Sequence, residues 1–133
     1  MDTDGGVVRE IRLVLTVEDF DAALAFYRDA LGLRHDAAIT SEGGRVAILH
    51  ADHATLELAD AGHAAYIDDL EVGRRVAGQV RVAFAVEDAG TTTATLVEAG
   101  AELVAPPTPT PWGSSNARLD APGPLHITVY SGE

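Results

Sequence analysis

The sequence predicts an α+β fold made of two tandem β-α-β-β-β modules, and two observations carry this prediction. The stretch Arg12–Asp19, Arg-Leu-Val-Leu-Thr-Val-Glu-Asp, returns in recognisable form as Arg81–Asp88, Arg-Val-Ala-Phe-Ala-Val-Glu-Asp. In both copies a helix-like segment follows and closes on a glycine, Gly32 in the first copy and Gly100 in the second. Each half of the chain is therefore expected to begin with a strand and to continue with a helix.

Length and composition limit the domain organisation. The chain has 133 residues, and a module of about 65 residues buries too little surface to fold alone. We therefore expect one domain over residues 1–133, in which the modules 7–60 and 79–133 share a core and 61–78 links them. The apolar fraction of 47% favours a globular protein, and no apolar run approaches the roughly 20 residues that span a bilayer.

Charge and cysteine content exclude several classes of function. With 21 acidic and 9 basic residues the net charge is −12, which repels nucleic-acid phosphates, so no nucleic-acid partner is expected. The absence of cysteine excludes disulfides, thiolate metal sites and cysteine nucleophiles. Residues 1–6 lack the basic start and apolar core of a secretory signal, so the cytoplasm is the expected location.

In the first module, apolar residues alternate along Val7–Val17, which is typical of a strand with one buried face. Asp19 is a candidate N-cap for a helix with apolar residues three and four apart, and Gly32 is a candidate C-cap. Three short runs follow, separated by turn-like segments such as Glu42–Gly44 that are too short for a parallel crossover. They predict an antiparallel meander over His35–Thr40, Arg45–His50 and Ala54–Ala59.

The second module repeats this order after a weakly patterned segment, 60–78, that favours a short linking helix. The proline run Pro106–Pro111 cannot donate a regular hydrogen-bond ladder and is interpreted as an extended edge or loop. The expected elements are a strand Val80–Val86, a helix Asp88–Ala99, strands Glu102–Ala105, Trp112–Leu119 and Leu125–Tyr130, and a turn Asp120–Gly123.

Short motifs add a family resemblance to the duplication. Val-Glu-Asp ends the first strand, Phe26-Tyr27 and Leu31-Gly32-Leu33 mark the first helix, and an Asp-x-x-Gly turn precedes the last strand. Over nearly its whole length the chain resembles the vicinal-oxygen-chelate superfamily, which includes glyoxalase I, bleomycin-resistance proteins and extradiol dioxygenases. The resemblance implies mixed sheets curled into a half-barrel around a ligand cavity. It also implies that metal-binding members take His or Glu ligands from the first and last strands of each module.

The residues at the implied ligand positions do not suit a metal. Arg12 and Arg81 stand where metal-binding members carry His, and a guanidinium has no lone pair to donate. Glu57 matches the carboxylate ligand, but the last strand offers His126, Ile127 and Thr128 where a Glu is expected. This set falls short of the three or four ligands of a catalytic divalent site, so we expect neither a metal nor another cofactor.

Alternation along the strands places Arg12, Glu57 and Arg81 on the face opposite the helices, where they are predicted to converge. They form either a structural ion cluster that shares Glu57, or a site in which one arginine binds the carboxylate, phosphate or phenolate of a ligand. Two cations against one anion favour the second interpretation slightly.

Other side chains are weaker candidates for the same cavity. Trp112 either stacks on a planar ligand or packs under a loop, and the second is favoured. Asn116 is a candidate polar contact, whereas Arg118 on the same strand face is interpreted as solvent-exposed. His126 is a candidate hydrogen-bond partner or general base. The remaining histidines are interpreted as surface residues, namely His35, His50, His53 and His63.

The leading functional hypothesis is a metal-free small-molecule binding protein of the bleomycin-resistance type, which sequesters an apolar or aromatic ligand with an anionic group. Its predicted ligand-binding residues are Arg12, Glu57, Arg81, Trp112, Asn116, His126 and Thr128. One alternative is a metal-dependent lyase, isomerase or ring-cleaving dioxygenase that uses Glu57 and His126, and another is a structural or interaction module. A homodimer is predicted, with Trp112 near the interface, and no membrane partner is expected.

Overall fold

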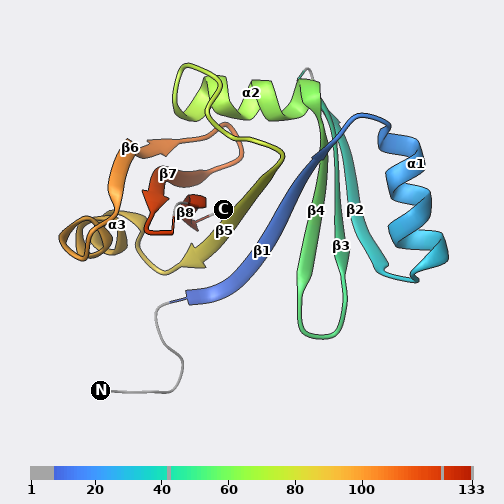
Figure 1. Cartoon of the computed structure of the whole chain (residues 1–133), viewed down its shortest axis with the longest axis horizontal. Coiled ribbons are helices and arrows are strands. Elements are labelled where there is room, and N and C mark those ends of the chain that lie inside the picture. The colour runs from blue at the N-terminus through green and yellow to red at the C-terminus, as the bar shows by residue number, and fades with distance from the viewer. Residues whose placement is uncertain (1–7, 42, 124, 133) are drawn as a thin grey trace.

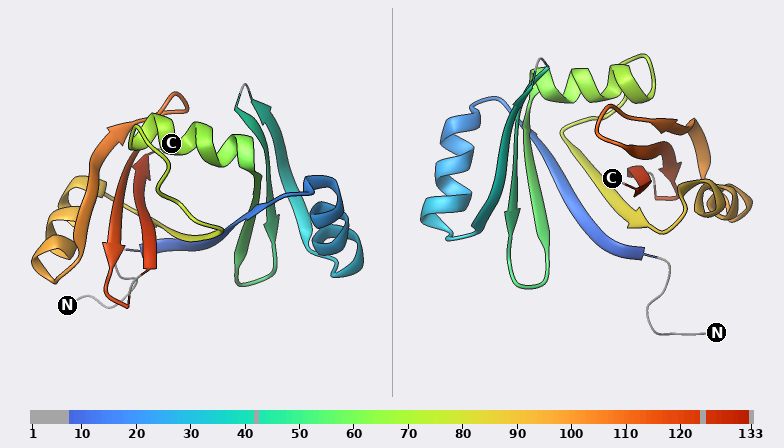
Figure 2. Two further views of the ribbon diagram at one scale, coloured as in Figure 1. Left: turned by 45° about the horizontal axis from the view of Figure 1, so that its top comes forward. Right: turned by 180° about the vertical axis from the view of Figure 1, so that it is seen from behind.

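One open, curled sheet organises the molecule, as Figures 1 and 2 show. The computed structural model describes residues 8–41, 43–123 and 125–132. The sheet is mixed and eight-stranded, with the order β2-β3-β4-β1-β5-β8-β7-β6. The α+β class and the curled half-barrel are confirmed.

The two halves of the chain have the same strand order on either side of a central seam. In each half the last strand returns parallel to the first, and β1 and β5 pair antiparallel where the halves meet. The elements are β1 (Val8–Val17), α1 (Phe20–Leu24) continued by the π-helical η1 (Ala25–Ala30), β2 (Arg34–Ser41), β3 (Gly44–His50), β4 (Thr55–Asp60), α2 (Ala61–Glu71), β5 (Val80–Val86), α3 (Ala89–Glu98), β6 (Glu102–Pro109), β7 (Ser114–Ala121) and β8 (Leu125–Gly132).

The predicted helix caps, the meander and the proline-rich edge are present in the structure. Asp19 caps α1 by accepting a hydrogen bond from the Ala22 N–H at 3.0 Å, and Asp88 caps α3 in the same way. Gly32 has a φ of 83°, the left-handed conformation that favours glycine after a helix. The β2-β3-β4 meander is antiparallel, and the proline-rich β6 is an edge strand with two register shifts.

Some predicted boundaries were wrong. β7 begins at Ser114 rather than at Trp112 and continues to Ala121, because Asp120 pairs in register with His126 of β8. The turn between the last two strands is therefore shorter than predicted. Val7 and Glu42, predicted to lie in a strand and in a turn, fall outside the described residues.

Helices cover the outer face of each half but not the central seam. One apolar cluster joins α1 to β3 and β4 through residues such as Phe20 and Leu58, and a second joins α3 to β7 and β8. On the outer face of the central strands, Ile11 remains 53% exposed and Leu13 41% exposed. These two residues lie on the predicted apolar face, yet none of the helices in the described part of the chain packs over them.

The linking helix α2 lies across the concave side of the sheet and spans both halves (Figure 1). Asp60 caps it by accepting a hydrogen bond from the His63 N–H at 2.8 Å. One stripe of α2 is buried against the sheet, namely His63, Ala64, Ile67, Asp68 and Glu71. Of the described helices, none has the length and apolar character needed to cross a membrane.

Candidate functional site

The concave face gathers polar side chains from both halves of the sheet. The outward-facing positions of β1, β4, β5, β7 and β8 pack in the two apolar clusters, so the alternate positions face α2. Among the predicted site residues, this places six on the concave side, namely Arg12, Glu57, Arg81, Asn116, His126 and Thr128.

Arg118 is the most deeply buried charged group of this face. It is 0% exposed, and α2 supplies both of its anionic partners. Its Nε donates to Glu71 Oε1 at 2.7 Å and its Nη1 donates to Asp68 Oδ1 at 2.8 Å. The interpretation of Arg118 as solvent-exposed was therefore wrong, because the sequence pattern does not reveal that a helix covers this strand face.

The two carboxylates of α2 also bind other groups. Asn116 Nδ2 donates to Glu71 Oε2 at 2.8 Å. Burial acts to raise the pKa of Asp68, but hydrogen bonds from the backbone N–H groups of Ala77 and Val76, together with Arg118, outweigh it and lower the pKa below 3.8. Asp68 therefore stays ionised in the folded protein. We name Arg118, Asp68 and Glu71 the α2 clamp.

Arg12 pairs with two carboxylates, although its buried Nε has no hydrogen-bond partner among the described residues. Its Nη1 donates to Glu57 Oε1 at 3.1 Å and its Nη2 to Glu10 Oε1 at 3.2 Å. Glu10 also accepts from the Thr55 hydroxyl at 2.7 Å and the Tyr130 hydroxyl at 3.3 Å. Sequence reasoning missed Glu10, although its alternation with Arg12 along β1 places it on the same face.

Hydrogen bonding and charge set the pKa values in this group. Burial acts to raise the pKa of Glu10, but Thr55, Arg12 and Tyr130 lower it below 4.5. Burial raises the pKa of Tyr130 to about 12, against the opposing charge of Arg12. At neutral pH Glu10 is therefore ionised and Tyr130 is a neutral phenol.

Arg81 differs from the other two arginines of the concave face. Its Nη1 donates to Thr128 Oγ1 at 2.8 Å, and no carboxylate of the described residues forms an ion pair with it. Burial, followed by the charge of Arg118, lowers its pKa from 12.5. Among the described residues, four carboxylates and four guanidiniums lie in or beside this face, so the two-to-one cation surplus counted from the sequence does not hold. What distinguishes Arg81 is its lack of a direct acidic partner.

His63 was also misassigned by the sequence. It is 9% exposed on the buried stripe of α2, and its Nδ1 has no hydrogen-bond partner among the described residues. Burial is the main cause that lowers its pKa below 6.5, and the charge of Arg81 adds to it. His63 is therefore a neutral side chain under α2 rather than a surface histidine.

His126 and Trp112 are the remaining predicted site residues, and of the two only His126 has polar contacts with other described residues. His126 lies between Asp120, 3.0 Å from its Nδ1, and Arg118, 3.2 Å from its Nε2. Since Arg118 can only donate, Nε2 accepts and Nδ1 carries the proton. Trp112, in contrast, is 47% exposed in the turn before β7 and makes no ring contact or hydrogen bond within the described part of the chain.

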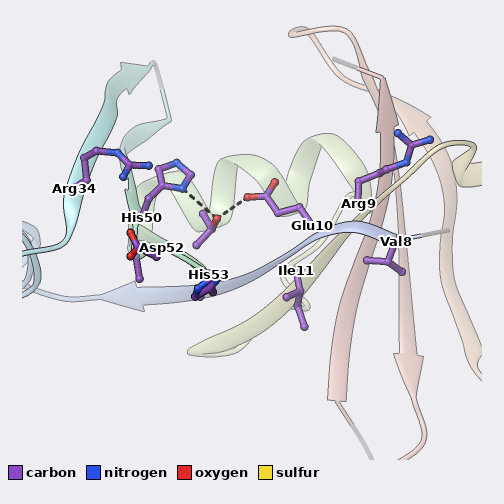
Figure 3. A pocket seen from close by; sticks show the side chains of 11 residues that line it. Val8, Arg9, Glu10, Ile11, Arg34, His50, Asp52 and His53 are labelled. Atoms are coloured by element: carbon purple, nitrogen blue, oxygen red, sulfur yellow. Dashed lines mark hydrogen bonds between the residues drawn. The ribbon is translucent and has the colours of Figure 1, made fainter. Parts of the chain in front are cut away.

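A pocket of about 440 Å³ adjoins the Arg12 group where β1 passes the turn between β3 and β4. Figure 3 shows Glu10 and His50 pointing toward one another from β1 and β3, joined through Thr55. Two residues that line this pocket also belong to the hydrogen-bonded group around Arg12: Glu10 accepts from Arg12, and Thr55 donates to Glu10. The pocket therefore borders the charged group around Arg12, whereas Arg81 and Thr128 are not among its lining residues.

Comparison with known proteins identifies the family of the chain. A family model described as Glyoxalase/Bleomycin resistance protein/Dioxygenase superfamily matches residues 11–123. The chain belongs to this superfamily. No protein in a search of curated sequences matches it.

Solved structures agree with the superfamily fold. A hypothetical protein from Bacillus halodurans C-125 is 16% identical with a TM-score of 0.68, over 94% of each chain. A superfamily member from Vibrio splendidus 12B01 is 13% identical with a TM-score of 0.64, over 93% of this chain and 98% of that one. A methylmalonyl-CoA epimerase from Mycobacterium tuberculosis is 17% identical with a TM-score of 0.63, over 96% and 88%. At these identities the likeness concerns the fold alone.

The residues of this superfamily member do not fit the divalent metal that the resemblance implies for metal-binding relatives. Arg12 and Arg81 occupy two of the expected ligand positions, and Glu57 is paired with Arg12. His126 directs both ring nitrogens to Asp120 and Arg118. No group of three metal-binding side chains occurs within residues 8–41, 43–123 and 125–132.

Breaking the α2 clamp should destabilise the fold. Arg118→Met leaves Glu71 buried without its cation, so we expect a loss of about 3–5 kcal/mol in the free energy of unfolding. Denaturant unfolding measures this. Arg9→Met is the matched control, because Arg9 and Glu87 form an exposed pair that contributes little. Equal stability of the two variants would contradict a clamp.

The clamp also predicts an acid dependence of stability. The folded pKa of Asp68 lies below its usual 3.8, so its ionised form contributes stability above that pH, and the contribution is lost as the pH falls through the folded pKa. The difference in unfolding free energy between wild type and Asp68→Asn should therefore shrink below about pH 3.8. A difference that stays constant from pH 7 to pH 3 would show that Asp68 is not stabilised as an anion.

Proposed function

We propose that the protein is a metal-free small-molecule binding protein that holds an apolar or aromatic ligand with an anionic group in its concave face. The observation that carries the proposal is the contrast between Arg12, which two carboxylates engage, and Arg81, whose hydrogen-bond partner is the hydroxyl of Thr128. A guanidinium has five N–H donors, so Arg81 has donors left for a ligand. Sequestration of the bleomycin-resistance type is the activity that we propose for this site.

Several neighbours of Arg81 support a role in binding. Thr128 fixes one edge of the guanidinium, which limits the rotamer freedom that binding would otherwise cost. Arg81 is partly accessible to solvent, whereas Arg118 is closed off. Val14 of the sheet and Ile67 of α2 are buried apolar side chains on the concave side.

Substitution of the two arginines separates binding from structure. Arg81→Met should keep the unfolding free energy within about 1 kcal/mol, since it breaks no ion pair. It should weaken binding of anilinonaphthalene sulfonate, an aromatic anion, by at least about tenfold in a fluorescence titration. Arg12→Met should lower the unfolding free energy by about 1–3 kcal/mol, because it leaves Glu10 and Glu57 without their cation. If Arg81→Met destabilises as strongly as Arg12→Met and leaves the affinity unchanged, both arginines belong to a structural cluster.

We further propose a homodimer. The uncovered apolar strip of the central strands, which includes Ile11 and Leu13, and the exposed ring of Trp112 are the surfaces that support it. Light scattering at micromolar concentration should give twice the 13.9 kDa of the chain, and a mass equal to one chain would contradict the dimer. Dilution to monomers should then red-shift the Trp112 emission, unless Trp112 lies outside the interface.

A further inference from the structure

Arg118 carries a donor that the α2 clamp does not use. Its Nε and Nη1 are bound to Glu71 and Asp68, but its Nη2 is buried and has no hydrogen-bond partner among the described residues. Buried polar groups in proteins are nearly always paired, and an unpaired charged donor is costly. An unpartnered group on a fully buried side chain therefore requires an explanation.

The second arginine with spare donors is connected to Arg118 through Thr128 of β8. Arg81 donates to Thr128 Oγ1, and Thr128 is also the cross-strand partner of Arg118 in the β7–β8 pairing. Thr128 thus binds the Arg81 guanidinium directly and pairs with Arg118 across the two strands. Their proximity is unfavourable by itself, because the charge of Arg118 acts, after burial, to lower the pKa of Arg81.

We propose that Arg81 and the Nη2 group of Arg118 together bind the carboxylate of a small monoanionic ligand. This inference rests on the proposed function and names the group that the concave face recognises. The two carboxylate oxygens accept from one guanidinium each, which pairs the unused donors and reduces the repulsion between the two cations. Arg118 is held for this role by Glu71 and Asp68, which fix the direction of its Nη2.

The charge of the surroundings selects the class of anion. Glu57, Glu71 and Asp68 all act on Arg81 electrostatically, and the arginines of the face are already balanced by carboxylates. A dianion such as phosphate therefore meets more repulsion than a carboxylate with a single charge.

Acetate and inorganic phosphate are the probes for this site, titrated at equal ionic strength into protein with 15N-labelled arginine. Acetate should shift the side-chain signals of both Arg81 and Arg118, and should bind more tightly than phosphate. The signals of Arg9, which is exposed and paired with Glu87, should not move. A shift of Arg81 alone, or a preference for phosphate, would overturn the inference.

Variants distinguish this inference from the proposed function. Arg118→Lys keeps a cation for Asp68 and Glu71 but lacks the second amino group, and it should weaken acetate binding by at least about tenfold. Arg9→Lys is the matched control and should bind acetate like the wild type. If Arg81→Met abolishes acetate binding and Arg118→Lys does not, the inference fails and the proposed function stands. If neither variant affects binding, both fail. Should Arg118→Lys not fold, the arginine signals of the wild type decide.

Discussion

The buried guanidinium of Arg118 is the constraint on which the arrangement of the concave face depends. A charge that is 0% exposed must be paired and hydrogen-bonded. The sheet supplies Asn116 and His126 around it, but the anions come from α2, the segment that links the two halves. The clamp therefore places the linking helix across the concave side and ties both halves of the chain to one another.

This placement gives the three arginines of the face different roles. Arg118 holds α2, Arg12 joins β1 to β4 through Glu57, and Arg81 contacts Thr128 without a direct acidic partner. Under the proposed function, the arginines at the expected metal-ligand positions make this superfamily scaffold a face that binds anions. In such a face, recognition depends on the direction of hydrogen-bond donors more than on net charge, because the nearby carboxylates nearly neutralise the cations.

The sequence predicted the features that depend on local or repeated patterns. The duplication, the alternation along β1 and β5, and the capping residues Asp19 and Asp88 each act within a few residues, so they identify the modules and the strand faces. The contact between Arg12 and Glu57 also followed from alternation, because both side chains occupy one face of neighbouring strands.

The features that the sequence did not reveal depend on what covers the sheet. Asp68, Glu71 and His63 look like surface residues of a weakly amphipathic segment, and only the position of α2 buries them. Arg118 was misjudged for the same reason. An excess of charged residues in a linker beside an unexplained arginine on a strand face is a signal that could have pointed to the clamp.

Metal analysis combined with a crystal structure of protein prepared without chelator tests the central claim, a ligand-binding concave face that works without a metal. We expect no stoichiometric divalent ion, an intact contact between Arg12 and Glu57, and density for any bound ligand beside Arg81. A stoichiometric divalent ion coordinated by Glu57, with Arg12 displaced from it, would contradict the account.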